Sequence, residues 1–136
     1  MISLAKSYLA MIYTSWVSLM IYLVGGFDVL FRALLIMMAL DYITGLIKGY
    51  KNKNINSKSA YKGFWKKIVV LIIVVGATQM DIILKNAGVR TLVLMFYVAT
   101  EFLSIIENAS VLGVPIPDKL KNALEQCRDN KEIDKI

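Results

Sequence analysis

Residues 91–110 read TLVLMFYVATEFLSIIENAS, an apolar stretch with a carboxylate, Glu101, near its middle. Two further apolar stretches, at about 29–47 and 68–84, contain Asp41 and Asp81 in the same way. Each charge placed near the centre of a bilayer costs about 2.5–3.5 kcal/mol. The three carboxylates therefore need ion-pair partners, a neighbouring subunit or water. The sequence predicts an oligomer with a polar interior.

The composition indicates an integral membrane protein. Hydrophobic residues make up 57% of the 136 residues, and no charged residue occurs between Lys6 and Asp28. That uncharged run is long enough to span a hydrocarbon core. Lipid admits only helices or closed barrels, and these apolar runs lack the alternation of barrel strands. A soluble core with helices buried on all sides would leave too few polar faces. We therefore predict an all-α, multi-pass membrane protein with one domain over residues 1–136.

Four transmembrane helices are expected, at about 8–24, 29–47, 68–84 and 91–110. The first segment is similar to a signal peptide, but it lacks a small-x-small cleavage site, so we interpret it as an uncleaved anchor. Pro115 and Pro117 interrupt the helical pattern after the fourth segment. A short amphipathic helix, capped by Asp118, is predicted within the tail 113–136.

Lysines are concentrated between the second and third segments, in a predicted loop at 48–67 that contains no acidic residue. This bias is typical of a cytoplasmic loop. It places the tail and both termini in the cytoplasm if all four segments span. Nucleic-acid binding is disfavoured because the loop has no arginine and lies between membrane spans. The topology-setting residues are Lys51, Lys53, Lys58, Lys62, Lys66 and Lys67.

Polar residues form stripes along three of the expected helices. They are Asp41, Thr44 and Lys48 in the second segment, Thr78, Asp81 and Lys85 in the third, and Tyr97, Glu101, Ser104 and Asn108 in the fourth. Each stripe fits either helix–helix contact or the lining of a water-filled pore. Asp81 and Lys85 are spaced for an i,i+4 ion pair, as are Asp28 and Arg32. Glu101 has no such partner on its own helix, and Arg32 is the main candidate to reach it.

The sequence offers no enzyme site. There is no histidine, and the single cysteine, Cys127, lies in the polar tail. Glu101 and Glu107 project about 120° apart on one helix, so they do not converge as an acid–base pair. Glycine-rich phosphate loops and metal-ligand spacings are missing from the sequence. We predict no catalysis, cofactor or metal.

Five motifs, in order, give the chain a resemblance to the toxin-secretion/phage-lysis holin family of Gram-positive bacteria and their phages. They are Asp41-Tyr-Ile-Thr-Gly-Leu-Ile-Lys48, Ser57-Lys-Ser-Ala-Tyr-Lys-Gly63 with Lys66-Lys67, Arg90-Thr-Leu-Val93, Glu101-Phe-Leu-Ser-Ile-Ile-Glu-Asn108 and Gly113-Val-Pro-Ile-Pro-Asp-Lys-Leu120. The resemblance covers about residues 28–124. The first 25 residues contain no matching motif.

The resemblance implies a homo-oligomer in the bacterial cytoplasmic membrane, where it accumulates and then assembles into lesions. Endolysin, or in some relatives a large toxin, leaves through them. Two alternatives stay open: an antiholin or regulatory homologue that co-assembles with a holin, and a small ion channel in which Glu101 forms a selectivity ring.

Overall fold

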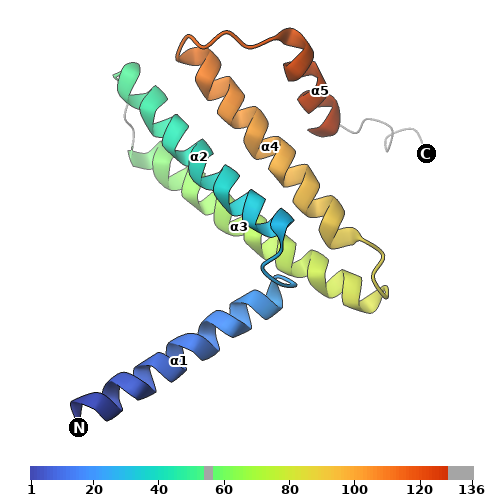
Figure 1. Cartoon of the computed structure of the whole chain (residues 1–136). Coiled ribbons are helices and arrows are strands. Elements are labelled where there is room, and N and C mark those ends of the chain that lie inside the picture. Colours follow the sequence, from blue (N-terminus) through green and yellow to red (C-terminus); the bar gives the residue numbers. More distant parts are fainter. Residues whose placement is uncertain (54–56, 129–136) are drawn as a thin grey trace.

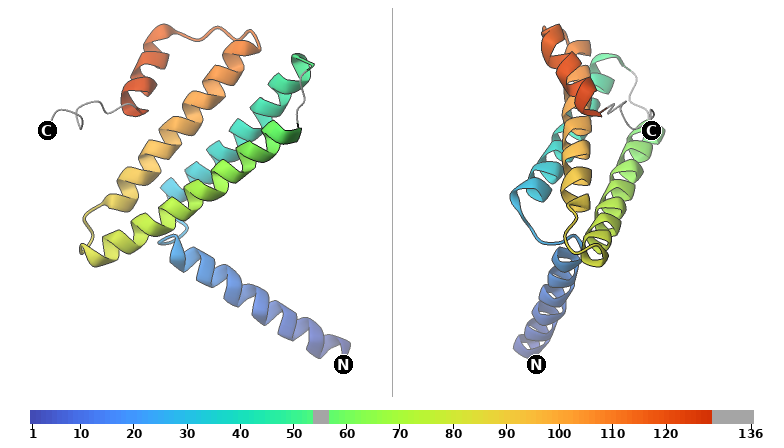
Figure 2. Two further views of the ribbon diagram at one scale, coloured as in Figure 1. Left: turned by 180° about the vertical axis from the view of Figure 1, so that it is seen from behind. Right: turned by 90° about the vertical axis from the view of Figure 1, so that its right-hand side faces the viewer.

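The computed structural model describes residues 1–53 and 57–128, and all regular structure in these residues is helical (Figure 1). The helices are α1 (Ile2–Leu23), α2 (Val29–Lys51), α3 (Ser57–Ile83), α4 (Val89–Val111) and α5 (Asp118–Arg128). Helices α2, α3 and α4 lie side by side as a bundle. Helix α1 projects away from one end of it, and α5 folds back beside α4 (Figure 2). The all-α prediction is confirmed at this level.

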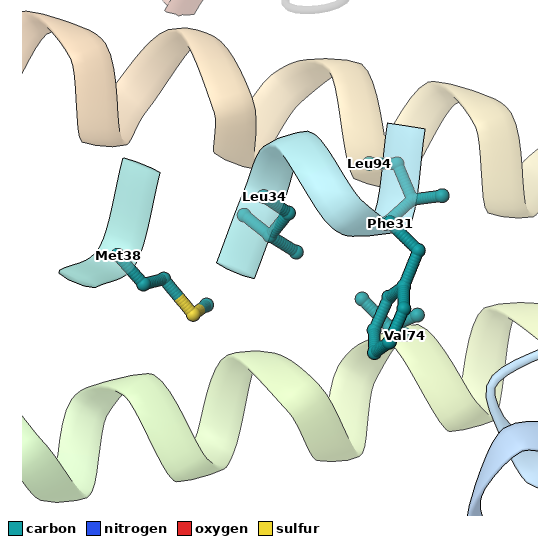
Figure 3. Close-up of a cluster of buried hydrophobic side chains, with 5 residues drawn as sticks. All are labelled: Phe31, Leu34, Met38, Val74 and Leu94. Atoms are coloured by element: carbon teal, nitrogen blue, oxygen red, sulfur yellow. The ribbon is translucent and has the colours of Figure 1, made fainter. Parts of the chain in front are cut away.

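The core of the bundle lies where α2 faces both α3 and α4. Phe31, Leu34 and Met38 are spaced three and four residues apart, so they share one face of α2. They pack with Val74 of α3 and Leu94 of α4 (Figure 3). Leu34, Val74 and Leu94 have no exposed surface. One apolar stripe on α2 thus holds the three helices together.

The predicted loop at 48–67 is largely helical, which corrects the expected boundaries. Helix α2 continues to Lys51, and α3 begins at Ser57. Lysine is a good helix former, and a helix does not need to stop where its sequence ceases to be apolar. Apolar content indicates where a helix can meet lipid, whereas hydrogen bonding decides where it ends. Lys58, Lys62, Lys66 and Lys67 therefore belong to α3.

Two of the described helices, α2 and α4, have the length and apolar composition needed to cross a membrane. The four-span arrangement stays a prediction. Helix α1 is exposed along almost all of its length, including the aromatic side chains of Tyr8, Tyr13 and Trp16. Among the described helices, it packs against α3 alone. Its apolar surface needs lipid or another protein surface to cover it.

Candidate functional site

Lys67 joins the carboxylates of two other helices near the middle of the bundle. Its ammonium group donates to Asp41 Oδ2 of α2 at 2.8 Å and also to Glu101 of α4. Asp41 and Glu101 lie in the middle turns of their helices, and Lys67 lies well inside α3. Two of the three carboxylates singled out in the sequence therefore share one cation. That cation comes from the segment expected to be a loop.

Asn108 extends this network towards the α2 C-terminus. Its amide nitrogen donates to Asp41 Oδ1 and to Thr44 Oγ1, both at 3.2 Å, while its amide oxygen accepts from Lys48 Nζ at 2.9 Å. The carboxamide fits because it can donate and accept at once. We call the complete set the polar hub. Its members are Asp41, Thr44, Lys48, Lys67, Glu101 and Asn108.

The polar hub is partly buried, and its formal charges balance. Glu101 is 9% exposed and Asn108 is 6% exposed. The negative charges of Asp41 and Glu101 match the positive charges of Lys67 and Lys48. No buried side-chain nitrogen or oxygen atom within residues 1–53 and 57–128 lacks a hydrogen-bond partner. The cost of burying these charges is therefore offset within one chain.

A polar groove of about 390 Å³ opens beside the hub, between α2 and the N-terminal half of α3. Hub members Asp41, Lys48, Lys67 and Asn108 line it, together with Ser104 of the predicted stripe. Gly45, Gly49 and Gly63 also line it, and their lack of side chains leaves the space open. The groove gives water a route to the hub from the lysine-rich end of the bundle.

The predicted stripes on α2 and α4 converge, with one exception. Asp41, Thr44 and Lys48 meet Glu101 and Asn108 in the hub. Tyr97, by contrast, is partly buried and packs against the apolar core. A helix face that is polar at one level can be apolar a turn away, because the neighbouring helices change along its length.

The stripe predicted on α3 does not reach the hub. Thr78 is 6% exposed and donates to the carbonyl of Val74 on its own helix. The carboxylate of Asp81 accepts the backbone N–H groups of Val89 at 2.7 Å and Arg90 at 3.0 Å. Asp81 therefore caps the start of α4, where free N–H groups favour a negative charge.

Both predicted i,i+4 ion pairs are wrong. Helix α3 ends at Ile83, so Lys85 lies outside it with φ +52, and the described residues contain no Asp81–Lys85 ion pair. Asp28 precedes α2 and caps it by accepting the N–H of Phe31 at 2.9 Å. Its ion-pair partner is Arg90 of α4, not Arg32. Pairing at i,i+4 requires a helix through both residues, but α3 ends before Lys85 and α2 begins only after Asp28.

Arg90 is the centre of a second polar cluster at the end of the bundle opposite Lys48. Its guanidinium donates to Asp28 Oδ2 at 2.5 Å, to the carbonyl of Val24 at 2.6 Å and to that of Gly26 at 3.1 Å. We call Arg90, Asp28, Asp81 and the carbonyls of Val24 and Gly26 the Arg90 cluster. The hydrogen bonds from Arg90 hold the pKa of Asp28 below its usual value, so this carboxylate stays ionised at physiological pH.

Sequence reasoning missed two residues that organise these clusters. Lys67 was assigned to topology alone, and Arg90 was only part of a motif. Both residues lie outside the apolar runs, and both lie within the motifs that gave the family resemblance. Arg32 was the main candidate partner for Glu101 besides water, but the partner is Lys67, because α3, rather than the start of α2, faces the middle of α4.

Comparison with known proteins gives a consistent result. A family model described as the bacteriophage holin family matches residues 18–129, from the second half of α1 through α5. A probable holin of Bacillus phage phi105 is 38% identical over 100 residues, which cover 73% of this chain and 74% of that protein. The residues matched by the family model include both polar clusters.

Two bacterial proteins are also similar. An uncharacterized 14.9 kDa protein in the nagH 3′ region of Clostridium perfringens is 40% identical over 116 residues, covering 84% of this chain and 88% of the relative. The uncharacterized protein YqxH of Bacillus subtilis is 37% identical over 116 residues, covering 85% and 82%. No solved structure matches the chain.

Proposed function

The chain belongs to the bacteriophage holin family, and from that premise we propose that it is a holin that oligomerises and opens lesions in the bacterial cytoplasmic membrane. Family membership and the apolar helices indicate a non-enzymatic membrane protein. We propose that endolysin passes through these lesions and that lysis of the host cell follows. Export of a large toxin is the variant of this function implied for some relatives.

The charge balance of the polar hub carries the proposal. A lesion-forming protein must first accumulate without harming the membrane, and a single copy with uncompensated charges would be poorly tolerated in lipid. Here Lys67 pairs with both Asp41 and Glu101 inside one chain, and Lys48 adds a second positive charge that donates to Asn108 of the same hub. A monomer can therefore reside in the bilayer with its hub closed.

The same residues suit the lining of an aqueous lesion. If α2, α3 and α4 separate within an assembly, the hub side chains can be solvated by water instead of by one another. Burial and solvation thus supply two states with similar electrostatic cost, and self-association selects between them. The polar groove beside the hub marks where water would first enter.

The proposal also includes the membrane topology of the chain. The lysine-rich end of the bundle, with the ends of α2 and α4, lies on the cytoplasmic side. The turn between α3 and α4 lies outside. Helix α1 supplies the fourth span, which places both termini in the cytoplasm.

Two other functions make different predictions. An antiholin would delay lysis by a co-expressed holin and would not open lesions itself. A small ion channel would depolarise the membrane without passing a folded protein. The holin assignment is favoured because the phi105 relative is a probable holin and the holin family model matches residues 18–129, which contain both polar clusters.

Controlled expression in a Gram-positive host, with and without a co-expressed endolysin, tests the proposal. A holin halts growth abruptly, and lysis follows only when endolysin is present. Uptake of a membrane-impermeant dye should begin at the same moment. Depolarisation without lysis in the endolysin strain would identify a channel, and delayed lysis by a second holin would identify an antiholin.

A further inference from the structure

The turn between α1 and α2 is built as a hinge. Gly25 and Gly26 adopt φ +80 and +105, conformations that glycine accommodates most easily. The N–H of Gly26 donates to the carbonyl of Ile21 at 2.9 Å, which ends α1 in the manner of a Schellman turn. Two consecutive glycines make this connection the most deformable backbone near α1.

Arg90 holds both sides of this hinge. On the α1 side, it donates to the carbonyl of Val24 at 2.6 Å. On the α2 side, it donates to Asp28, which caps α2. The planar guanidinium presents several donors in a fixed geometry, so one side chain from α4 can hold three acceptors at once. Arg90 is only 9% exposed.

The contact between Arg90 and the hinge leaves no room for a side chain. A Cβ atom on Gly25 would lie 2.7 Å from Arg90 Nε and 3.0 Å from Thr78 Cγ2. Gly88, in contrast, has a similar φ of +83 and has nothing within 4 Å of its Cβ position. Gly25 is therefore constrained by Arg90 as well as by its backbone conformation.

Little else fixes the direction of α1. Beyond the contact of α1 with α3, an apolar groove of about 490 Å³ lies between the two helices. Val17 and Met20 of α1 line one wall, and Leu71 and Ile72 of α3 line the other. In lipid, closing two apolar walls gains no hydrophobic free energy, because the acyl chains that leave are equally apolar. A polar contact at the hinge can therefore decide where α1 lies.

We propose that Arg90 is a positioning residue for α1, acting as a latch that holds this helix away from the bundle. When the latch opens, α1 turns about Gly25 and Gly26 and closes the groove against α3. Closure aligns α1 with α2, α3 and α4, as a fourth span requires. The latched structure therefore represents one of two placements of α1. This inference rests on the proposed four-span topology but not on lesion formation.

Disulfide cross-linking within the full-length protein in membranes tests the latch. Val17→Cys and Ile72→Cys place one thiol on each wall of the groove, in a Cys127→Ser background. Adding Arg90→Gln should raise the rate of intramolecular cross-linking by about tenfold, which corresponds to roughly 1.4 kcal/mol of lost latch stability. Arg90→Lys should give an intermediate rate, because lysine retains the positive charge but lacks the planar guanidinium with its several donors.

Two matched controls separate the latch from general damage. Arg32→Gln removes an exposed arginine of α2 near the same end and should leave the rate unchanged. Gly25→Ala should raise the rate by colliding with Arg90, whereas Gly88→Ala, with equivalent backbone strain, should not. Equal cross-linking in Arg90→Gln and the parent protein, at equal membrane levels and helical content, would overturn the proposal. So would an equal increase in Gly25→Ala and Gly88→Ala.

Discussion

The polar hub and the Arg90 cluster both pair a basic side chain with a carboxylate, yet they hold different parts of the chain. In the hub, Lys67 joins side chains from the interiors of three helices. In the Arg90 cluster, the guanidinium binds two carbonyl groups, and Asp81 binds two backbone N–H groups. The hub therefore ties the interiors of α2, α3 and α4 together, whereas the Arg90 cluster holds the ends of helices. A change in the hub should alter the bundle, and a change in the cluster should alter α1.

The largest expected difference between the two ends of the bundle is their accessibility to a reagent added outside the cell. Ala87→Cys, in the turn beside the Arg90 cluster, and Ser57→Cys, at the start of α3, are placed in a Cys127→Ser background. Both positions are exposed in the structure. A membrane-impermeant maleimide added to intact cells before lysis should label Ala87→Cys fully and leave Ser57→Cys unlabelled. Labelling of Ser57→Cys alone would invert the proposed topology.

Removing the cation of the hub should have the next largest effect. Lys67→Gln leaves Asp41 and Glu101 close together without the cation they share, which should cost about 3–5 kcal/mol. The midpoint of thermal unfolding in detergent should fall, and the protein should accumulate poorly or trigger early. Lys66→Gln, an exposed neighbour on α3, is the control and should behave as the parent.

The double variant Lys67→Gln with Glu101→Gln sharpens the same test. It restores the formal charge balance, because Asp41 and Lys48 remain. Much of the lost stability should therefore return. If the double variant is no more stable than Lys67→Gln alone, the two residues do not act as a pair.

Glu101→Gln alone should have a moderate effect, since Lys67 keeps its bond to Asp41. The variant removes an ion pair from the closed hub and so destabilises it. In an assembled lesion the Glu101 charge would face water and contribute little to stability, so its loss would matter less there. The onset of lysis should therefore move earlier at equal protein levels, with Phe102→Leu as the control. If Glu101 instead faced lipid in the monomer, as its isolated position on α4 suggested, the neutral variant would delay lysis. The sign of the change in onset decides between these arrangements.

The smallest expected effect lies outside both clusters. Truncation after Pro117 removes α5, which packs beside α4 without contributing a residue to the hub or the Arg90 cluster. Lysis should still occur, with a modest shift in onset. Complete loss of lysis, at normal membrane levels of the truncated protein, would assign α5 a role in assembly.

The sequence by itself determined the helical class, the membrane setting and the family. Apolar runs with helical spacing admit few alternatives in lipid, because every backbone polar group must be satisfied within the segment. The sequence also identified Asp41, Asp81 and Glu101 as the carboxylates that need partners. The apolar run at about 91–110 predicted α4 well, because the helix observed there is Val89–Val111.

Only the tertiary structure decided which charges meet. Lys67 looked like one lysine of a cytoplasmic loop, and Asp28 looked like the i,i+4 partner of Arg32. The spacing of residues along one helix cannot show which residues of other helices they meet, because it gives no information on how the helices are oriented relative to one another. That orientation is set by the packing of Phe31, Leu34 and Leu94 in the core. The ion pairs of this protein are therefore a consequence of apolar packing, which brings residues far apart in the sequence to within hydrogen-bonding distance.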